Sequence, residues 1–229
     1  MTATQVGSRI LAALAGVRDP ELDEPVTVLG FVASAVIDDD GTAVVHLRLP
    51  TYFCAPNFAY LMVADAYDAV AALDEVRRAE VVLDDHFASD AINEGVAARA
   101  GFVASFEGEA VDELDKLRKD FLRKAVLAGT DVVCRPLPSP GTSTLGDVPP
   151  SRALDQLRRR RAELGLPADD ASPLLIDPVT GAAIADDQVP LHLRRARLTR
   201  TSLDANTGIC RGMLRHRYST DGQGEQAQE

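Results

Sequence analysis

The first half of the chain changes between helical and strand periodicity at turn-forming residues. Apolar residues first recur at helical spacing and then stop at Asp19-Pro20: Ile10, Leu11, Leu14 and Val17. Residues 26–37 are rich in β-branched and apolar side chains, and they are followed by a polar turn at 38–41 and a second such run at 43–49. This pattern predicts a helix followed by a β-hairpin.

Helical spacing returns over residues 58–73, and the run 80–84 predicts a third strand. The order helix, strand, strand, helix, strand is typical of an α+β fold. We therefore expect a small three-stranded mixed or antiparallel sheet with helices packed on it.

Beyond the third strand, the pattern predicts a mostly helical and extended extension. Helices are expected over 88–98 and 111–127, and a short strand over 131–134. Residues 136–150 are so rich in Pro, Gly, Ser and Thr that we expect an extended linker. Ser151 is a suitable N-cap for a further helix that ends at Glu163.

Together these expectations divide the chain into five parts. They are a domain at 1–98, a helical extension at 99–135, the linker at 136–150, a basic region at 151–220 and a disordered tail at 221–229. The basic region has few large apolar residues, so we expect it to pack against the first domain or a partner. Its four consecutive arginines are the candidate partner-binding residues: Arg158, Arg159, Arg160 and Arg161.

Composition narrows the protein class. The chain has 229 residues, 46% of them hydrophobic, without an apolar run long enough to cross a membrane or a secretory signal at its start, so we expect a cytoplasmic protein without a membrane partner. Residues 1–150 carry 12 basic and 24 acidic side chains, so nucleic acid is not an expected partner. Three widely spaced cysteines argue against a disulfide framework.

Cys54 is the most distinctive candidate for chemistry. It lies in the segment 50–58, where the second strand gives way to a helix. A thiol at a helix N-terminus is favoured as a thiolate, which can act as a nucleophile or a metal ligand, although a lone cysteine is also a common buried residue. Because zinc and iron–sulfur clusters want about four ligands, a site at one cysteine must be open, shared in a homodimer, or completed by a partner.

Two acidic segments could supply further ligands. Asp19 and Glu21 flank Pro20 between the first helix and the first strand, and His86 follows two aspartates at the end of the third strand. Carboxylates and a histidine could bind a metal, but an ordinary turn and a solvated loop explain the same residues. Cys210 and His216 could share zinc, although no second such pair is nearby in sequence.

These motifs, in this order, resemble the MIP18-like (DUF59) family. The resemblance covers residues 8–95 and includes Asp19-Pro20-Glu21-Leu22, the run 28–32 and the loop after the hairpin. Thr51, Cys54 and Pro56 are similar to the family's loop at a helix start, and the Pro50-Thr51-Tyr52 run resembles the branch that accompanies multicomponent oxygenases. In that branch an aspartate follows the last strand, as Asp90 does here.

The resemblance implies an accessory factor for iron–sulfur cluster or metal-centre assembly rather than an enzyme. It implies a transient iron or cluster held by Cys54 with Asp19, Glu21 and His86 as candidate ligands, and a client metalloprotein that could be an oxygenase component. The alternatives are a non-catalytic binding subunit in which Cys54 is merely buried, and a hydrolytic or redox enzyme that uses Cys54 with His86. The absence of phosphate-binding-loop and Gly-x-Ser-x-Gly motifs gives no support to several standard enzyme classes.

Overall fold

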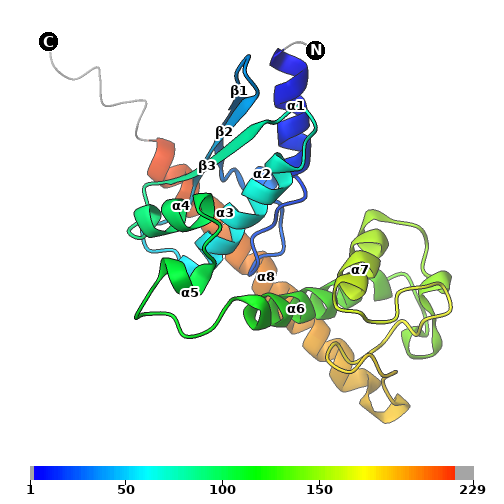
Figure 1. Cartoon of the computed structure of the whole chain (residues 1–229). Coiled ribbons are helices and arrows are strands. Elements are labelled where there is room, and N and C mark those ends of the chain that lie inside the picture. The colour runs from blue at the N-terminus through cyan, green and yellow to red at the C-terminus, as the bar shows by residue number, and fades with distance from the viewer. Residues whose placement is uncertain (1–2, 220–229) are drawn as a thin grey trace, which may run out of the picture. The chain divides into compact units, whose positions relative to one another are not determined.

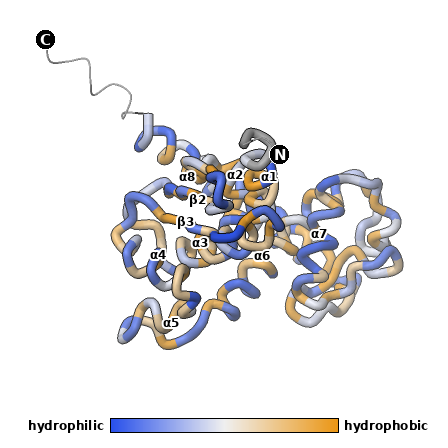
Figure 2. Tube along the Cα trace, turned by 45° about the horizontal axis from the view of Figure 1, so that its top comes forward, coloured by the Kyte–Doolittle hydropathy of each residue, from blue (hydrophilic) through white to orange (hydrophobic). Residues whose placement is uncertain are grey.

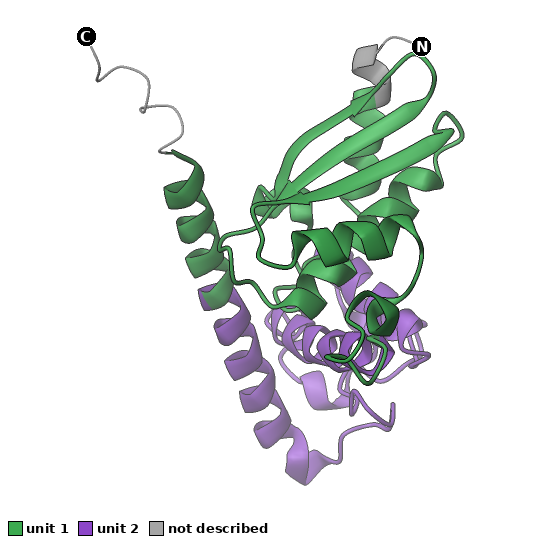
Figure 3. Cartoon of the chain, turned by 60° about the vertical axis from the view of Figure 1, so that its left-hand side comes forward, with its two compact units in different colours: residues 1–114, 206–229 green, residues 115–205 purple. Residues whose placement is uncertain are grey.

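The computed structural model describes residues 3–219, which form two compact units that we describe separately. Unit 1 contains residues 1–114 and 206–229, and unit 2 contains residues 115–205 (Figure 3). The long helix α8 (Val189–Ser219) begins in unit 2 and ends in unit 1. Within residues 3–219, no helix has both the length and the apolar character needed to cross a membrane.

Unit 1 is built on a three-stranded mixed sheet, as the sequence predicts. Strand β1 (Val32–Ile37) pairs antiparallel with β2 (Thr42–Arg48), and β2 pairs in parallel with β3 (Arg78–Asp84) (Figure 1). The turn at 38–41 is closed by Asp38 and Asp40, whose Oδ1 atoms accept the Thr42 amide at 2.8 and 3.0 Å. The α+β fold class and the hairpin are therefore confirmed.

The helices of unit 1 bury the alternating apolar side of that sheet. They are α1 (Ala3–Leu14), α2 (Val26–Leu29), α3 (Pro56–Ala71), α4 (Ser89–Ala97) and α5 (Phe102–Ser105). In β2 every second residue is buried, and Val45 packs in one core with Leu14 of α1 and Val63 of α3. The parallel β2–β3 pair is possible because α3 supplies the crossover connection.

One expectation for this unit was wrong at its start. Residues 26–37 were expected to be extended throughout, whereas Val26–Leu29 form one helical turn that ends at Gly30 with φ +80°. The turn buries Val26 and Leu29 together, and the left-handed conformation that glycine permits redirects the chain into β1. A helix of four residues is too short to show helical periodicity, so the sequence pattern could not predict it.

Unit 2 has its own apolar core between α6 (Asp115–Cys134) and α7 (Arg152–Glu163). Ser151 caps α7 as predicted, by accepting the Leu154 amide at 3.2 Å. The strand expected at 131–134 was wrong, because these residues complete α6 and bury Val133 and Cys134 on its inner face. The expected tail at 221–229 lies outside the described residues.

The extended conformation expected for the linker at 136–150 was also wrong in part. It contains the 3-10 helices η1 (Pro140–Thr142) and η2 (Leu145–Asp147), while η3 (Asp186–Gln188) precedes α8. Thr144 and Asp147 form a capping box, with the Thr144 amide donating to Asp147 Oδ2 at 2.8 Å. Leu145 and Val148 are buried in the unit 2 core, so two apolar side chains fix a segment whose composition is that of a loop.

Much of α7 is coloured hydrophilic in Figure 2 because of its four arginines, but not all of these side chains lie at the surface. Arg161 is fully buried and donates to the carbonyls of Pro173 at 3.0 Å and Leu174 at 2.5 Å. Arg158 donates to the Ala168 carbonyl and pairs with Asp170. Arg160 is also buried, so of the four candidate partner-binding arginines the structure leaves Arg159 as the exposed one, and partner binding stays a prediction.

Candidate functional site

The loop between β2 and α3 places Cys54 directly before a helix, as predicted. Ala55 is the N-cap of α3 without a side-chain cap, and Pro56 occupies the first turn, where its missing N–H is no loss. Cys54 is half-buried, and its Sγ lies 3.3 Å from Thr51 Oγ1. Thr51 also accepts the Phe53 amide at 3.2 Å, so this side chain both shapes the loop and contacts the thiol.

His86 holds this loop through backbone atoms. Its Nε2 lies 2.7 Å from the carbonyl of Cys54, and the Ala88 amide donates to its Nδ1 at 3.2 Å. A carbonyl can only accept and an amide can only donate, so the imidazole is neutral, with its proton on Nε2. Burial lowers the pKa of His86, although the bond to Cys54 opposes that shift.

This geometry corrects the expected role of His86. Both ring nitrogens are occupied by backbone groups, so neither is available as a metal ligand or as a base for the Cys54 thiol. The enzyme hypothesis that paired Cys54 with His86 loses its general base. His86 is instead a positioning residue for the loop, and it is only 3% exposed.

Asp19 is a turn residue whose carboxylate is turned inward. Its Oδ1 accepts the amides of Glu21 at 2.9 Å and Leu22 at 2.8 Å. Burial raises the pKa of Asp19 to about 6, against the opposing effect of these two hydrogen bonds. The ordinary turn that the sequence left open as an explanation is therefore present at this position.

Helix α8 adds a second thiol to this part of unit 1, which the sequence did not predict. Cys210 packs against the same core as Cys54. Burial raises the pKa of Cys210 to about 11, and the charges of Asp19, Cys54 and Glu21 raise it further. The sequence considered Cys210 only with His216, because 156 positions separate it from Cys54 and only the return of α8 to unit 1 relates them.

The loop is also held from α8. Arg217 donates to the carbonyls of Leu49 at 3.1 Å and Asp85 at 2.6 Å, and so joins the loop that contains Cys54 to the loop after β3. The Phe87 amide donates to the Tyr52 carbonyl at 3.2 Å between the same two loops. The position of Cys54 is thus fixed by contacts from three separate segments of unit 1.

Three aromatic rings next to Cys54 remain exposed. Tyr52 and Phe53 lie edge to face with centroids 5.1 Å apart, and Phe87 lies 6.3 and 6.2 Å from them. Phe53 is 77% exposed. Large apolar rings gathered at the surface are typical of interaction sites, so the thiol lies beside an aromatic patch.

The predicted ligands do not form a closed metal site. Within residues 3–219, no three His, Cys, Asp or Glu side chains gather closely enough to bind a metal ion. Asp90 is exposed in the first turn of α4, where no hydrogen bond or ion pair of the described residues joins it to Cys54. An iron ion or cluster bound by Cys54 would need ligands from outside this set.

Comparison with known proteins identifies the segment that carries this loop. Residues 8–82 match the family model described as iron–sulfur cluster assembly protein, which spans α1 to most of β3. This segment of unit 1 is therefore similar to that family. The resemblance of the sequence to the MIP18-like (DUF59) family is thereby confirmed, and the family indicates a role related to iron–sulfur cluster assembly.

One solved structure is also similar to the chain, a crystal structure of a domain of unknown function, DUF59, from Bacillus anthracis. It is 23% identical, the match covers 43% of this chain and 92% of that chain, and the TM-score is 0.34. Comparison with curated proteins gave no match. The residues that match the family model, 8–82, include β1, β2 and most of β3, while unit 2 and α8 lie outside them.

Proposed function

We propose that this protein is an accessory factor that handles iron or an iron–sulfur cluster as cargo and delivers it to a client metalloprotein. The observation that carries the proposal is the position of Cys54: a half-buried thiol in an anchored loop of an assembly-family domain, bordered by three exposed aromatic rings. A thiolate is a ligand for iron and for its clusters.

The incomplete ligand set suits transfer better than storage. One thiolate leaves most coordination positions of an iron centre to other donors, so the cargo would be held weakly until a client or a second copy supplies the rest. Asp19, Glu21 and Cys210 are candidate donors within the chain, because the charges of Asp19, Glu21 and Cys54 all act on Cys210. The aromatic patch would give the client an apolar surface on which to dock.

The client that we propose to test first is a component of a multicomponent oxygenase. The support is the Pro50-Thr51-Tyr52 run at the start of the loop, which resembles that branch of the family. Tyr52 is one of the three exposed rings, so the residue that distinguishes the branch also lies on the proposed docking surface.

The test is anaerobic reconstitution with iron and sulfide, followed by transfer to an apo-client. Wild-type protein should take up iron and activate the client, whereas Cys54→Ser should keep its fold and lose both properties. Cys134→Ser is the matched control, because Cys134 is buried in unit 2. Equal client activation by Cys54→Ser and wild type would reject the cargo role.

The second candidate function is a non-catalytic docking subunit, which the exposed aromatic patch also supports. The two proposals predict different results for one pair of variants. A docking subunit should lose client binding in Phe53→Ala and be unaffected by Cys54→Ser. A cargo carrier should lose client activation in both variants while Cys54→Ser still binds the client.

A further inference from the structure

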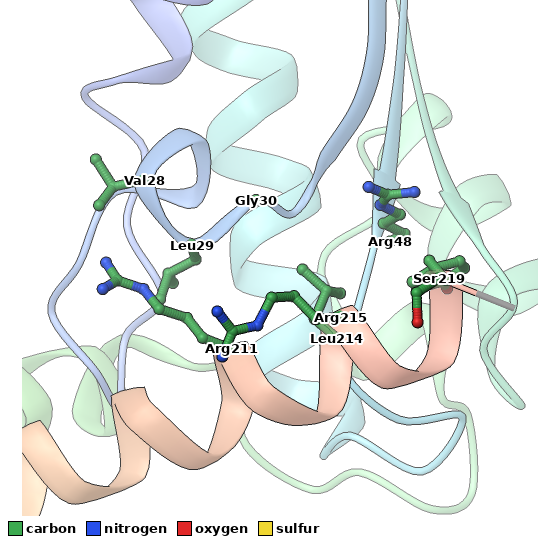
Figure 4. A pocket seen from close by; sticks show the side chains of 9 residues that line it. Val28, Leu29, Gly30, Arg48, Arg211, Leu214, Arg215 and Ser219 are labelled. Atoms are coloured by element: carbon green, nitrogen blue, oxygen red, sulfur yellow. The ribbon is translucent and has the colours of Figure 1, made fainter.

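Unit 1 contains a pocket that is separate from the Cys54 loop. The pocket has a volume of about 510 Å³ and lies between α8, the turn after α2 and the end of β2. Figure 4 shows Arg211 and Arg215 extending from α8 along the segment of Leu29 and Gly30, with Arg48 carried by the strand. Volumes of roughly 300–1,000 Å³ are usual for small-molecule sites.

Helical spacing explains how α8 forms one wall. Arg211, Leu214, Arg215 and Tyr218 are three or four residues apart and therefore share one face of the helix. Leu214 is 5% exposed and anchors this face in the unit 1 core. A Cβ at Gly30 would lie 3.3 Å from Leu214 Cδ2, so the glycine allows the helix to approach closely.

The pocket is cationic, although the protein has a net charge of −11. No ion pair with a carboxylate of residues 3–219 engages Arg48, Arg211 or Arg215. The charges of Asp84 and Asp85 reach the rim of the pocket, where they raise the pKa of Tyr218, and Asp84 is paired with His46 at 3.0 Å. Three arginines therefore line the pocket without an ion pair to a carboxylate of the described residues.

Polar atoms around the pocket also lack partners. Among the described residues, Arg48 Nε, Arg211 Nε and the Tyr218 hydroxyl are buried without a hydrogen bond. The Arg48 guanidinium stacks over the Tyr218 ring at 4.6 Å. Buried polar groups without partners are unfavourable, and three around one pocket indicate a site that accepts hydrogen-bonding groups from a ligand.

We propose that this pocket binds a small organic phosphate, with the phosphate held by Arg48, Arg211 and Arg215 and an apolar portion against Val28, Leu29 and Leu214. A dianionic phosphate matches several guanidinium forks better than a single carboxylate does. Inorganic phosphate has no apolar group that could pack against the apolar side chains of the pocket. The organic portion of an organic phosphate could pack there, so it should increase the affinity.

The experiment measures binding to the full chain by calorimetry at fixed ionic strength. The probes are phenyl phosphate, inorganic phosphate, benzoate and an oligoglutamate peptide. Phenyl phosphate should bind most tightly, and Arg215→Gln and Arg211→Gln should each weaken it about ten-fold or more, as expected for a lost charge-assisted hydrogen bond. The thermal transition without ligand reports whether each variant is folded.

Arg78→Gln is the matched control, because it removes the same charge from an exposed arginine of β3 that pairs with Glu80 outside this pocket. It should bind phenyl phosphate as wild type does. The proposal is overturned if wild type binds no phenyl phosphate at millimolar concentration, or if Arg215→Gln binds it equally well. If inorganic phosphate binds as tightly as phenyl phosphate, the apolar side chains do not bind an organic portion of the ligand. If benzoate or oligoglutamate binds more tightly than phenyl phosphate, the ligand is not a phosphate.

Discussion

At the scale of single residues, similar side chains have different chemistry because their surroundings differ. Burial raises the pKa of Cys134 to about 12 and that of Cys210 to about 11. His86 binds backbone groups that shape the loop of Cys54, and Asp19 accepts two backbone amides of its own turn. Cys54 itself remains partly accessible beside Thr51. Burial and hydrogen bonding thus leave Cys54, in its anchored loop, as the thiol best placed to react.

The first prediction concerns thiol reactivity. At pH 7, iodoacetamide should alkylate Cys54 faster than Cys134 or Cys210, because a thiol whose pKa is raised to 11 or 12 holds almost no thiolate at that pH. Time-resolved peptide mass spectrometry gives the three rates. Faster labelling of Cys210 than of Cys54 would contradict the choice of Cys54 as the working thiol.

The second prediction follows from Asp19, whose folded-state pKa is about 6 against an ordinary value of 3.8. Below pH 4 the carboxyl is protonated in both folded and unfolded states and has no effect. As pH rises from 4 to 6, the unfolded chain releases the proton first, so the folded state loses about 2–3 kcal/mol of stability relative to it.

Asp19→Asn keeps an oxygen acceptor for the Glu21 and Leu22 amides but cannot ionise. Urea denaturation across pH 4 to 7 should therefore show the variant gaining stability relative to wild type as pH rises. A difference between the two proteins that stays constant over this range would show that Asp19 does not titrate as described.

At the scale of elements, buried arginines connect irregular segments to helices. Arg161 lies in the interior of unit 2, where burial lowers its pKa to about 10 and the carbonyls of Pro173 and Leu174 accept its hydrogen bonds. Asp131 of α6 accepts from Arg200 of α8 at 2.8 Å within the same unit. The first pair of bonds anchors a coil segment to α7, and the last joins two helices.

The third prediction tests this role. Arg161→Ala should destabilise unit 2 by about 3 kcal/mol or more, because it removes a buried side chain and leaves carbonyls without donors. Arg159→Ala, on the exposed side of the same helix, should change the free energy of unfolding by less than about 0.5 kcal/mol. Chemical denaturation measures both, and equal effects would refute the distinction.

At the scale of the whole molecule, unit 1 is discontinuous in sequence. Its core combines residues of the assembly-family domain with Leu214 from the last turns of α8, and Arg217 bonds the carbonyls of Leu49 and Asp85. Of the basic region, residues 206–219 belong to unit 1. Residues 151–205 instead share a unit with α6.

The fourth prediction is that Leu214→Ala destabilises unit 1 by about 2–5 kcal/mol, the usual range for a buried leucine. Ile209→Ala removes an apolar side chain from an exposed position of α8 and should have little effect. Hydrogen exchange of the β2 and β3 amides should rise in the first variant only. Unchanged protection in Leu214→Ala would mean that α8 is not part of the unit 1 core.

The sequence by itself determined what local periodicity and short motifs encode. The alternation of β2, the polar turn at 38–41 and the cap of Ser151 follow from side chains a few positions apart. The order of motifs around Asp19 and Cys54 was sufficient to identify the family of the first domain. These features need no knowledge of the rest of the chain.

The tertiary structure decided everything that depends on residues far apart in sequence. Neither the bond of His86 to the Cys54 carbonyl nor the burial of Arg161 can be predicted from neighbouring residues, because the partners lie 32 and 12 positions away. Arg48 and Arg211 meet at one pocket for the same reason. Periodicity reports which face of an element is apolar, whereas burial and hydrogen bonding depend on which distant segment covers that face.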